Sequence, residues 1–436
     1  MTRTTLILIG GFAVLLTGTG LLGTLLGVRA AIMSFGDVAI GAIMAGYYGG
    51  YIAGTYLAPR VIRNVGHIRS FAAFAAVAAA STIAFGLVAD AWSWLALRLL
   101  GGLCIVGLYM VVESWLNEQC EGRARGRVFS VYIMSTLVAL GAGQLLLPLA
   151  DPGGMVLFAV ASILISVGIV PIAATRITEP QIRLAQGLEL GELLRISPLG
   201  VVGALSAGVL SGAFWGMTPV FSQRLGLTEA QIAGLMSATI FGGAALQWPI
   251  GHLSDRIDRR TVLIGVSLVT ALAAAATGYV VMGGRSGLVV VGFLYGGVMF
   301  SLYGIAVAHA NDHLGAGQVL EATRGLLLVF GFGALIGPLA AGVAMATAGP
   351  VGLPAMATTT ALLLALYGVY RTRRRQAPPL AEQGEFVPMV RTTPVALELS
   401  PQAAETPPQE GQPAPRGDPG ASGGDEKSRA APTPVD

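Results

Sequence analysis

The segment TTLILIGGFAVLLTGTGLLGTLLG, residues 4–27, decides the fold of this chain. It carries no charge and exceeds the roughly 20 residues that a helix needs to cross a hydrocarbon core about 30 Å thick. Lipid offers no water to backbone N–H and C=O groups, so such a segment has to be helical. Eleven further apolar segments lie near residues 37–58, 70–89, 92–113, 128–149, 155–174, 198–220, 231–253, 261–282, 287–308, 322–347 and 350–370. The sequence therefore predicts an all-α membrane protein with twelve transmembrane helices.

The composition supports this class independently. The chain is 54% hydrophobic and only 11% charged, with a mean hydropathy of +0.72, and a water-soluble globule of that composition would aggregate. The first segment ends at Gly27 and Val28 without a cleavage motif before a polar domain, so we expect it to be retained as a span. Two cysteines, Cys104 and Cys120, imply no disulfide framework.

The loops between the segments alternate in arginine content, which predicts the orientation. Loops on the side of the N-terminus hold eighteen arginines up to residue 375, and loops on the other side hold three, namely Arg29, Arg224 and Arg285. Cationic loops resist translocation, so both termini are expected in the cytoplasm and the protein in the cytoplasmic (inner) membrane of a bacterial-type cell. The net charge of +3 and the pI near 9.0 then reflect topology and not nucleic-acid binding.

The chain is predicted to contain two six-helix bundles and a tail. The first bundle covers residues 1–174, a cytoplasmic connector 175–197, the second bundle 198–370, and a disordered cytoplasmic tail 371–436. The tail holds 12 of the 23 prolines between Pro378 and Pro434, and a segment of this kind buries too little apolar surface to offset its ordering entropy. In the connector, the leucines around Glu189, Glu192 and Arg195 predict a short interfacial helix.

The two halves also show a weak internal repeat. With an offset of 194 residues, five positions in and after the fourth segment match positions in and after the tenth, namely Gly102, Leu108, Tyr109, Asn117 and Glu118 with Gly296, Leu302, Tyr303, Asn311 and Asp312. With an offset of 196, Arg60 and Arg63 fall on Arg256 and Arg259. Parallel repeats of this kind are typical of transporters built from two related bundles.

Two motifs resemble the major facilitator superfamily, and the resemblance covers essentially residues 1–370. The stretch GHLSDRIDRR, residues 251–260, resembles the family's G-x-L-x-D-R-x-x-R-R loop, and LRLLGGLCIVG, residues 97–107, is similar to the arginine and glycine motif of its fourth span. The stretches VESWLN, residues 112–117, and QWPIG, residues 247–251, resemble a poorly characterised bacterial branch of efflux-type or sugar-type carriers. The resemblance implies a secondary transporter and does not settle a substrate.

The loop motif predicts a cytoplasmic gate. An aspartate at the end of one helix can pair with arginines at the start of the next and hold the two helices together until a conformational change breaks the pair. We expect Asp255, with the three arginines that follow it, to act in this way; the first half retains two arginines but has Pro59 in place of the aspartate. The alternative is that these side chains only anchor the loops in the cytoplasm. The predicted gate residues are Asp255, Arg256, Arg259, Arg260, Arg60 and Arg63.

Arg98 and Glu113 are the predicted residues for substrate or proton handling. An arginine within a span costs about 2.5 to 3.5 kcal/mol on insertion scales, so it usually faces a cavity or a partner. Its alternative is a snorkelling position near the outer interface, beside Trp92 and Trp94. A partly desolvated carboxylate such as Glu113 can couple protonation to a conformational change, or it can serve as a structural part of the inner gate. About 22 Å of helix separates it from Arg98, so the two cannot pair directly.

Polar and aromatic residues inside the spans could line a central pocket. Because few charges lie among them, they favour a neutral or amphiphilic organic solute, although each alone could be a packing residue. The predicted pocket residues are Thr17, Thr19, Tyr109, Trp215, Gln247, Trp248 and Tyr303. His309 and His313 have a spacing that could hold a metal, but we predict no metal site, since no thiolate or carboxylate cluster accompanies them.

The sequence thus predicts a secondary active transporter that moves a small organic solute by alternating access, coupled to protons, with efflux as one direction that the pattern allows. Alternatives are a proton-linked nutrient importer and a non-transporting membrane sensor or adaptor that uses the tail. No phosphate-binding loop and no catalytic Ser-His-Asp arrangement is recognisable, so we predict that the chain is not an enzyme, uses no cofactor and does not hydrolyse ATP. The expected partners are the solute, protons and the bilayer, and the protein is expected to be monomeric.

Overall fold

The computed structural model describes residues 2–119, 124–175, 188–284, 287–314 and 318–374, together with Gln383 and Phe386. The described residues form helices and no strand, in this order: α1 Arg3–Ile32, α2 Asp37–Val65, α3 His67–Leu87, α4 Ala91–Glu118, α5 Ala124–Gln144, the 3-10 turn η1 Leu147–Leu149, α6 Val156–Ala173, α7 Leu190–Ile196, α8 Pro198–Arg224, α9 Glu229–Ser254, α10 Arg259–Met282, α11 Leu288–Met299, α12 Ser301–Asn311, α13 Val319–Ala348 and α14 Gly352–Thr372.

Each of the twelve predicted segments corresponds to a helix, and the tenth is divided into α11 and α12 at Phe300. Several helices are longer than predicted: α1 has 30 residues, or about 45 Å, so it projects beyond the hydrocarbon core. Among the described residues, ten helical stretches are long and apolar enough to cross a membrane. Helices α2 and α9 have 29 and 26 residues but are more polar, because tyrosines and glycines in α2 and glutamines in α9 interrupt their apolar sequence.

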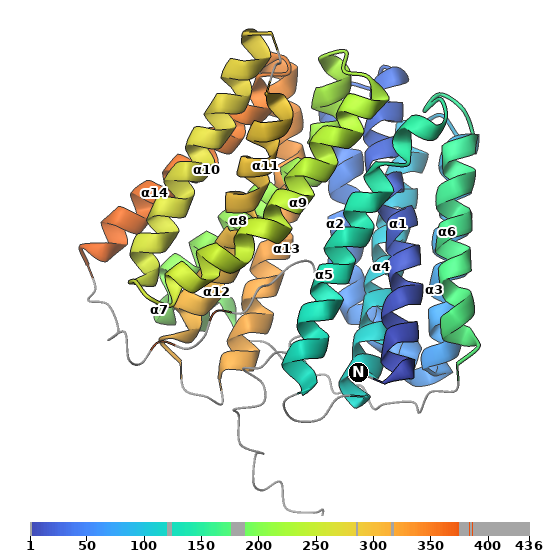
Figure 1. Cartoon of the computed structure of the whole chain (residues 1–436), viewed down its shortest axis with the longest axis horizontal. Helices are drawn as coiled ribbons and strands as arrows, with labels where there is room; N and C mark the ends of the chain where they lie inside the picture. Colours follow the sequence, from blue (N-terminus) through green and yellow to red (C-terminus); the bar gives the residue numbers. More distant parts are fainter. Residues whose placement is uncertain are drawn as a thin grey trace, which may run out of the picture.

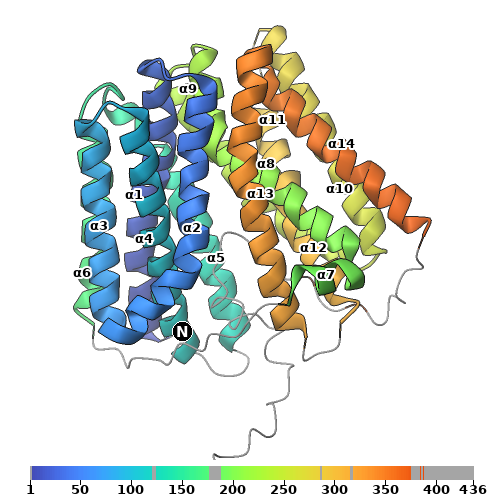
Figure 2. The ribbon, with the colours of Figure 1, turned by 180° about the vertical axis from the view of Figure 1, so that it is seen from behind.

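The helices lie in two groups, α1 to α6 and α8 to α14, with the short α7 between them in sequence (Figure 1). The groups meet where α1 packs on α8, α2 on α13 and α5 on α9. Figure 2 shows α2 beside α13 from the reverse side. We call the face at which α1 begins the N-terminal face and the opposite one the far face. In both views the two groups diverge toward the N-terminal face.

Glycines make equivalent helix crossings in the two halves, as the sequence repeat predicts. A Cβ added to Gly102 of α4 would lie 2.0 Å from the carbonyl oxygen of Tyr47 in α2. In the second half, a Cβ on Gly296 of α11 would lie 1.9 Å from the carbonyl oxygen of Thr239 in α9. Only residues without a side chain allow backbones to approach this closely, so both halves use the same device at the same place.

The connector helix α7 packs on protein through one leucine. Leu193 is buried and contacts Gly325 of α13, while Leu190 and Leu194 are exposed, as an interfacial helix requires. The prediction of a disordered tail lies almost entirely outside the described residues, as do Cys120 and most of the connector before Leu188. The arginines Arg123, Arg176, Arg183, Arg285 and Arg375 also lie outside them.

Candidate transport site

Polar contacts close the far face between the two helix groups. Asp37, the first residue of α2, accepts hydrogen bonds from Nε and Nη2 of Arg224 at 3.1 and 3.0 Å, and the same Nη2 donates to the Phe35 carbonyl at 3.0 Å. Between α5 and α9, the Ser237 hydroxyl donates to the Gly141 carbonyl at 3.0 Å. The Asp37–Arg224 pair is partly exposed, so it contributes up to about 1 kcal/mol to this closure.

Two glycines bring the backbones of α2 and α13 together at the same face. A Cβ on Gly41 would lie 2.5 Å from the carbonyl oxygen of Pro338, and a Cβ on Gly342 would lie 2.5 Å from that of Asp37. No side chain fits at either position while the backbones stay where they are. The far face is therefore closed by direct backbone contact as well as by the ion pair.

Gly342→Leu is expected to force the far face open, because its side chain overlaps the Asp37 backbone. Asp37→Asn removes only an exposed ion pair and should change the conformer ratio by at most about fivefold, the equivalent of about 1 kcal/mol. Spin labels on cysteines introduced at the exposed positions Asp90 and Ala230 would report the distance between the groups. An unchanged distance distribution in Gly342→Leu would contradict the steric argument.

Glu113 lies inside the first group with no exposed surface, near the end of α4 at the N-terminal face. The Tyr132 hydroxyl of α5 donates to its Oε1 at 2.8 Å. Phe12 of α1 packs on Tyr132, with ring centroids 6.2 Å apart, and edge-on against Tyr109 at 4.9 Å. A carboxylate buried in this way keeps its negative charge at a cost in free energy, and protonation or a conformational change can relieve that cost.

Arg98 is also buried in the first group, at 9% exposure. Its guanidinium lies 4.9 Å from the ring centroid of Tyr47, and its Nη2 lies 3.4 Å from the sulfur of Met44, both on α2. The cation is thus stabilised by an aromatic face inside the protein and does not reach the lipid surface. It joins α4 to α2 in the far-face half of the molecule, well separated from Glu113.

The loop motif forms a network within the second group. Arg259 at the start of α10 donates to Asp255 at 2.9 Å, to Asp312 at 2.6 Å and to the Ala308 carbonyl at 2.9 Å. The side chains of Arg259 and Asp312 are each only 1% exposed. This arginine therefore fastens the ends of α9, α10 and α12 together at the N-terminal face. The backbone N–H of Phe386 also donates to Asp255, at 2.9 Å.

The other predicted gate residues have different surroundings. Arg256 is exposed, and neither Arg60 nor Arg63 forms an ion pair among the described residues, although Arg60 donates to the Tyr56 carbonyl at 2.7 Å. Arg260 pairs with Asp258, with Nη2 and Oδ2 2.8 Å apart. Burial alone would raise the pKa of Asp258, but the hydrogen bonds from Arg260 outweigh it and hold this pKa below its ordinary value.

The predicted pocket residues do not form one cluster. Trp215 packs edge-on against Phe214 and lies near Phe300, while the ring of Tyr303 lies 4.7 Å from that of Phe330. The Tyr303 hydroxyl is buried with no hydrogen-bond partner among the described residues, and Gln247 is buried as well.

Other members of the set lie apart from these rings. Thr17 and Thr19 bond to carbonyls of their own helix. Trp248 is 69% exposed and stacks on His252. The structure brings Tyr109 close to the Glu113 site through their shared contacts with Phe12 and Tyr132.

The sequence analysis did not predict three partners: Tyr132 for Glu113, Asp312 for Arg259 and Arg224 for Asp37. The internal repeat aligns Asp312 with Glu118 and Arg259 with Arg63. These two matches were a usable signal for the pair of Asp312 and Arg259. The first and third pairs join segments that only the folded packing brings together.

Two groups of membrane-spanning helices that close at one face, diverge at the other and bury ionisable residues define a multi-pass membrane transporter. The chain belongs to the Major Facilitator Superfamily, whose family model matches residues 7–322 and 200–403. This family consists of transporters and not of enzymes, so the predicted fold class, the family and the absence of an enzymatic role are confirmed.

Relatives and solved structures agree with this assignment. An uncharacterized MFS-type transporter, YcaD, of Escherichia fergusonii is 29% identical over 339 residues, which are 77% of this chain and 87% of that protein. The nucleoside transporter NupG superposes with a TM-score of 0.68 at 12% identity, covering 86% of this chain and 100% of that one. A bacterial homolog to the human lysosomal transporter Spinster, in an inward-facing and unoccupied conformation, gives 0.67 at 15% identity, covering 88% and 99%. At these identities the two solved structures show the fold alone.

Proposed function

We propose that this transporter moves a small neutral or amphiphilic organic solute by alternating access, coupled to protons, as a monomer in the cytoplasmic membrane with both termini in the cytoplasm. The observation that carries the proposal is the fully buried Glu113, hydrogen-bonded to Tyr132 beside two aromatic rings. A carboxyl group placed there can carry one proton, and its environment changes whenever α4 and α5 rearrange.

The arrangement of the two groups supports alternating access. With the arginine-rich loops in the cytoplasm, the N-terminal face is the cytoplasmic one, so this conformation is closed outward by Asp37 and Arg224 and by the glycine contacts of α2 and α13. Domains 1–174 and 198–370 would rock relative to each other as two bodies, with the connector 175–197 between them. Transport requires the opposite state, in which these far-face contacts separate.

The side chains near the centre support an uncharged solute. Trp215 of α8 lies near Phe300, Tyr303 of α12 packs on Phe330 of α13, and the buried Tyr303 hydroxyl has no hydrogen-bond partner among the described residues. Aromatic rings with one unsatisfied hydroxyl suit an amphiphilic organic molecule better than a multiply charged one.

The direct experiment is uptake into vesicles that contain the purified full chain. A panel of small organic solutes is offered with and without an imposed pH gradient, and protein-free vesicles give the background. We expect at least one solute to accumulate in a gradient-dependent manner and to dissipate the gradient. Solute transport that is indifferent to pH would refute proton coupling while leaving transport itself in place.

The same alternating-access mechanism can import or export the solute. The glycine-proline stretch from Gly331 to Gly342, which resembles a pattern of antiporters, lies in α13 and packs on α2 at the far face. The superfamily's antiporters have the pattern that it resembles in the fifth span, whereas here it lies in the eleventh. The stretch therefore favours neither import nor export. The sign of the pH gradient that drives accumulation in the vesicle experiment distinguishes a nutrient importer from an efflux carrier.

Deletion of residues 376–436 separates a transporter from a tail-dependent adaptor. Phe386 is part-buried and contacts Asp255 and Gly251 at the N-terminal face, so the deletion removes these contacts with the loop motif and none of the buried groups named above. We expect solute uptake to stay within about twofold of the full chain, because no group proposed to act in transport is lost. Complete loss of uptake in a folded, membrane-inserted deletion variant would instead support the adaptor function.

A further inference from the structure

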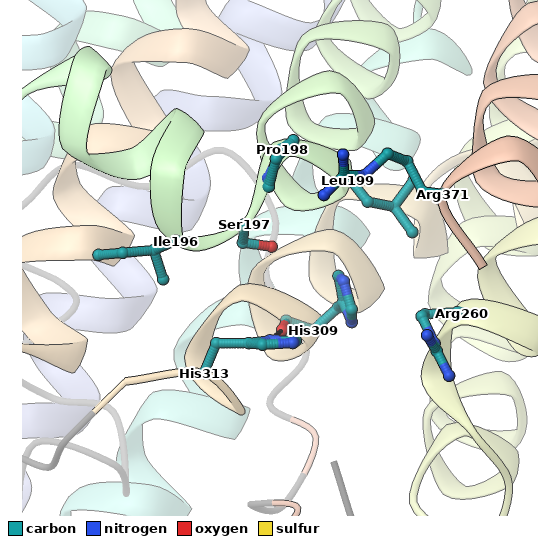
Figure 3. A pocket seen from close by; sticks show the side chains of 8 residues that line it. All are labelled: Ile196, Ser197, Pro198, Leu199, Arg260, His309, His313 and Arg371. Atoms are coloured by element: carbon teal, nitrogen blue, oxygen red, sulfur yellow. Dashed lines mark hydrogen bonds between the residues drawn. The ribbon is translucent and has the colours of Figure 1, made fainter. Parts of the chain in front are cut away.

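A small pocket opens at the N-terminal face of the second helix group, away from the contacts between the two groups. It lies where four helix ends meet: the start of α8, the start of α10 and the ends of α12 and α14. Ser197, Arg260, His309, His313 and Arg371 contribute its polar lining. Figure 3 shows Ser197, His309 and Arg371 around one space, with Arg260 at its right-hand edge.

The polar lining of this pocket is cationic or hydrogen-donating. The lining contains two guanidinium groups and two imidazoles and no carboxylate. Asp258 engages Nε and Nη2 of Arg260 from outside the lining, which leaves Arg371 as the principal net charge. Such a set repels a metal cation and suits an anion, so the histidine spacing does not mark a metal site.

His309 supplies the observation that points to a ligand. Its side chain is 5% exposed and lines the pocket, yet its ring nitrogens have no hydrogen-bond partner among the described residues. His313 is held in place because its Nδ1–H donates to the His309 carbonyl at 2.9 Å, and the two rings meet edge to face at 4.9 Å. An imidazole carries at least one N–H in either charge state, and the pocket gives a ligand access to the ring of His309.

The start of α8 adds a positive electrostatic potential to that of the arginines. Ser197 is the N-cap of this 27-residue helix, and its hydroxyl accepts from the Gly200 N–H at 3.2 Å. The positive end of the helix dipole therefore points into the pocket that His309 and Arg371 line. A tetrahedral oxyanion can accept from a guanidinium and an imidazole N–H while it lies in the favourable field of the helix start.

We propose that this pocket binds a phosphoryl oxyanion, contributed either by the headgroup of an anionic phospholipid or by free inorganic phosphate. With the N-terminal face in the cytoplasm, the pocket lies at the depth of the inner-leaflet headgroups, where basic pockets between helices hold such lipids. The proposal concerns the ends of α8, α10, α12 and α14 and does not depend on which solute is transported or on proton coupling.

The test compares the purified full chain, Arg371→Gln and a matched control, Arg373→Gln, which changes an exposed arginine two residues along that the pocket does not include. In delipidated detergent solution, inorganic phosphate is titrated against chloride at equal ionic strength while the unfolding temperature is recorded. In parallel, native mass spectrometry counts phosphatidylglycerol and phosphatidylcholine molecules retained by each protein. Loss of one charge-assisted hydrogen bond, about 1.5 to 3 kcal/mol, should weaken binding at least about tenfold in Arg371→Gln only.

The two arms distinguish the sources. A phosphate-dependent rise in unfolding temperature that Arg371→Gln loses identifies free phosphate, and selective retention of phosphatidylglycerol that Arg371→Gln loses identifies the lipid. His309→Gln, which keeps an N–H donor of similar size, should bind more weakly than the wild type and more tightly than His309→Ala. Equal responses of Arg371→Gln and Arg373→Gln, or no response of the wild type to either ligand, would overturn the proposal.

Discussion

Glu113→Gln is expected to reduce pH-driven accumulation of the transported solute to the background of protein-free vesicles. Glutamine has the size of glutamate and can still accept from the Tyr132 hydroxyl, so the packing around Phe12 is preserved. It cannot take up or release a proton, however, so solute movement is no longer tied to proton movement. The measurement is gradient-driven uptake of the solute found in the panel, recorded together with internal pH.

Solute exchange in the absence of a gradient should persist in Glu113→Gln, because exchange needs the conformational change and no net proton transfer. The matched control is Glu118→Gln, which alters an exposed carboxylate farther along the same helix and should leave coupling intact. If Glu113→Gln accumulates solute as the wild type does, Glu113 is a structural residue of the inner end of α4 and the proton acceptor lies elsewhere.

Arg259→Ala is expected to cost about 3 to 5 kcal/mol of folding stability, the usual effect of removing one partner from a buried ion pair. The Asp312 side chain, only 1% exposed, would lose the guanidinium that lies 2.6 Å from it. Asp255 and the Ala308 carbonyl would lose hydrogen bonds at the same time. Thermal unfolding of the purified protein in detergent, followed by intrinsic fluorescence, measures the change.

Arg256→Ala is the matched control, since it alters an exposed arginine of the same motif. It should change stability by no more than about 0.5 kcal/mol, as substitutions of isolated surface charges do. Equal losses in the two variants would mean that the motif acts through its overall charge and not through the network around Arg259.

Most of the architecture could be predicted from the sequence, because the bilayer imposes length and apolarity on each segment separately. The ends of the helices were less accurate: α2 continues to Val65, seven residues past the predicted end, since a helix does not stop where lipid stops. Pro59 lies inside that extension. In α2, neither the polar residues nor the proline marks the end of the helix.

The candidate site could be predicted only in part, and the reason is distance along the chain. The pair of Asp255 and Arg259 is readable because only the short turn between α9 and α10 separates its members. The Asp37–Arg224 pair spans 187 residues and depends on how two bundles meet, which periodicity does not encode. Arg98 was expected at a cavity or near the outer interface, and its partner proved to be the ring of Tyr47, a residue that reads as ordinary core.

The glycine crossing between α8 and α13 bears on how variant libraries of this protein should be interpreted. A Cβ at Gly208, Gly212, Gly333 or Gly337 would lie 2.2 Å from a backbone oxygen of the opposite helix. Even alanine should be rejected at these sites, so a saturation screen scored by growth or fluorescence would rank them with ionisable residues in mutational intolerance. Ranking by intolerance alone would thus mistake glycines that are needed for close helix packing for residues that take part in transport.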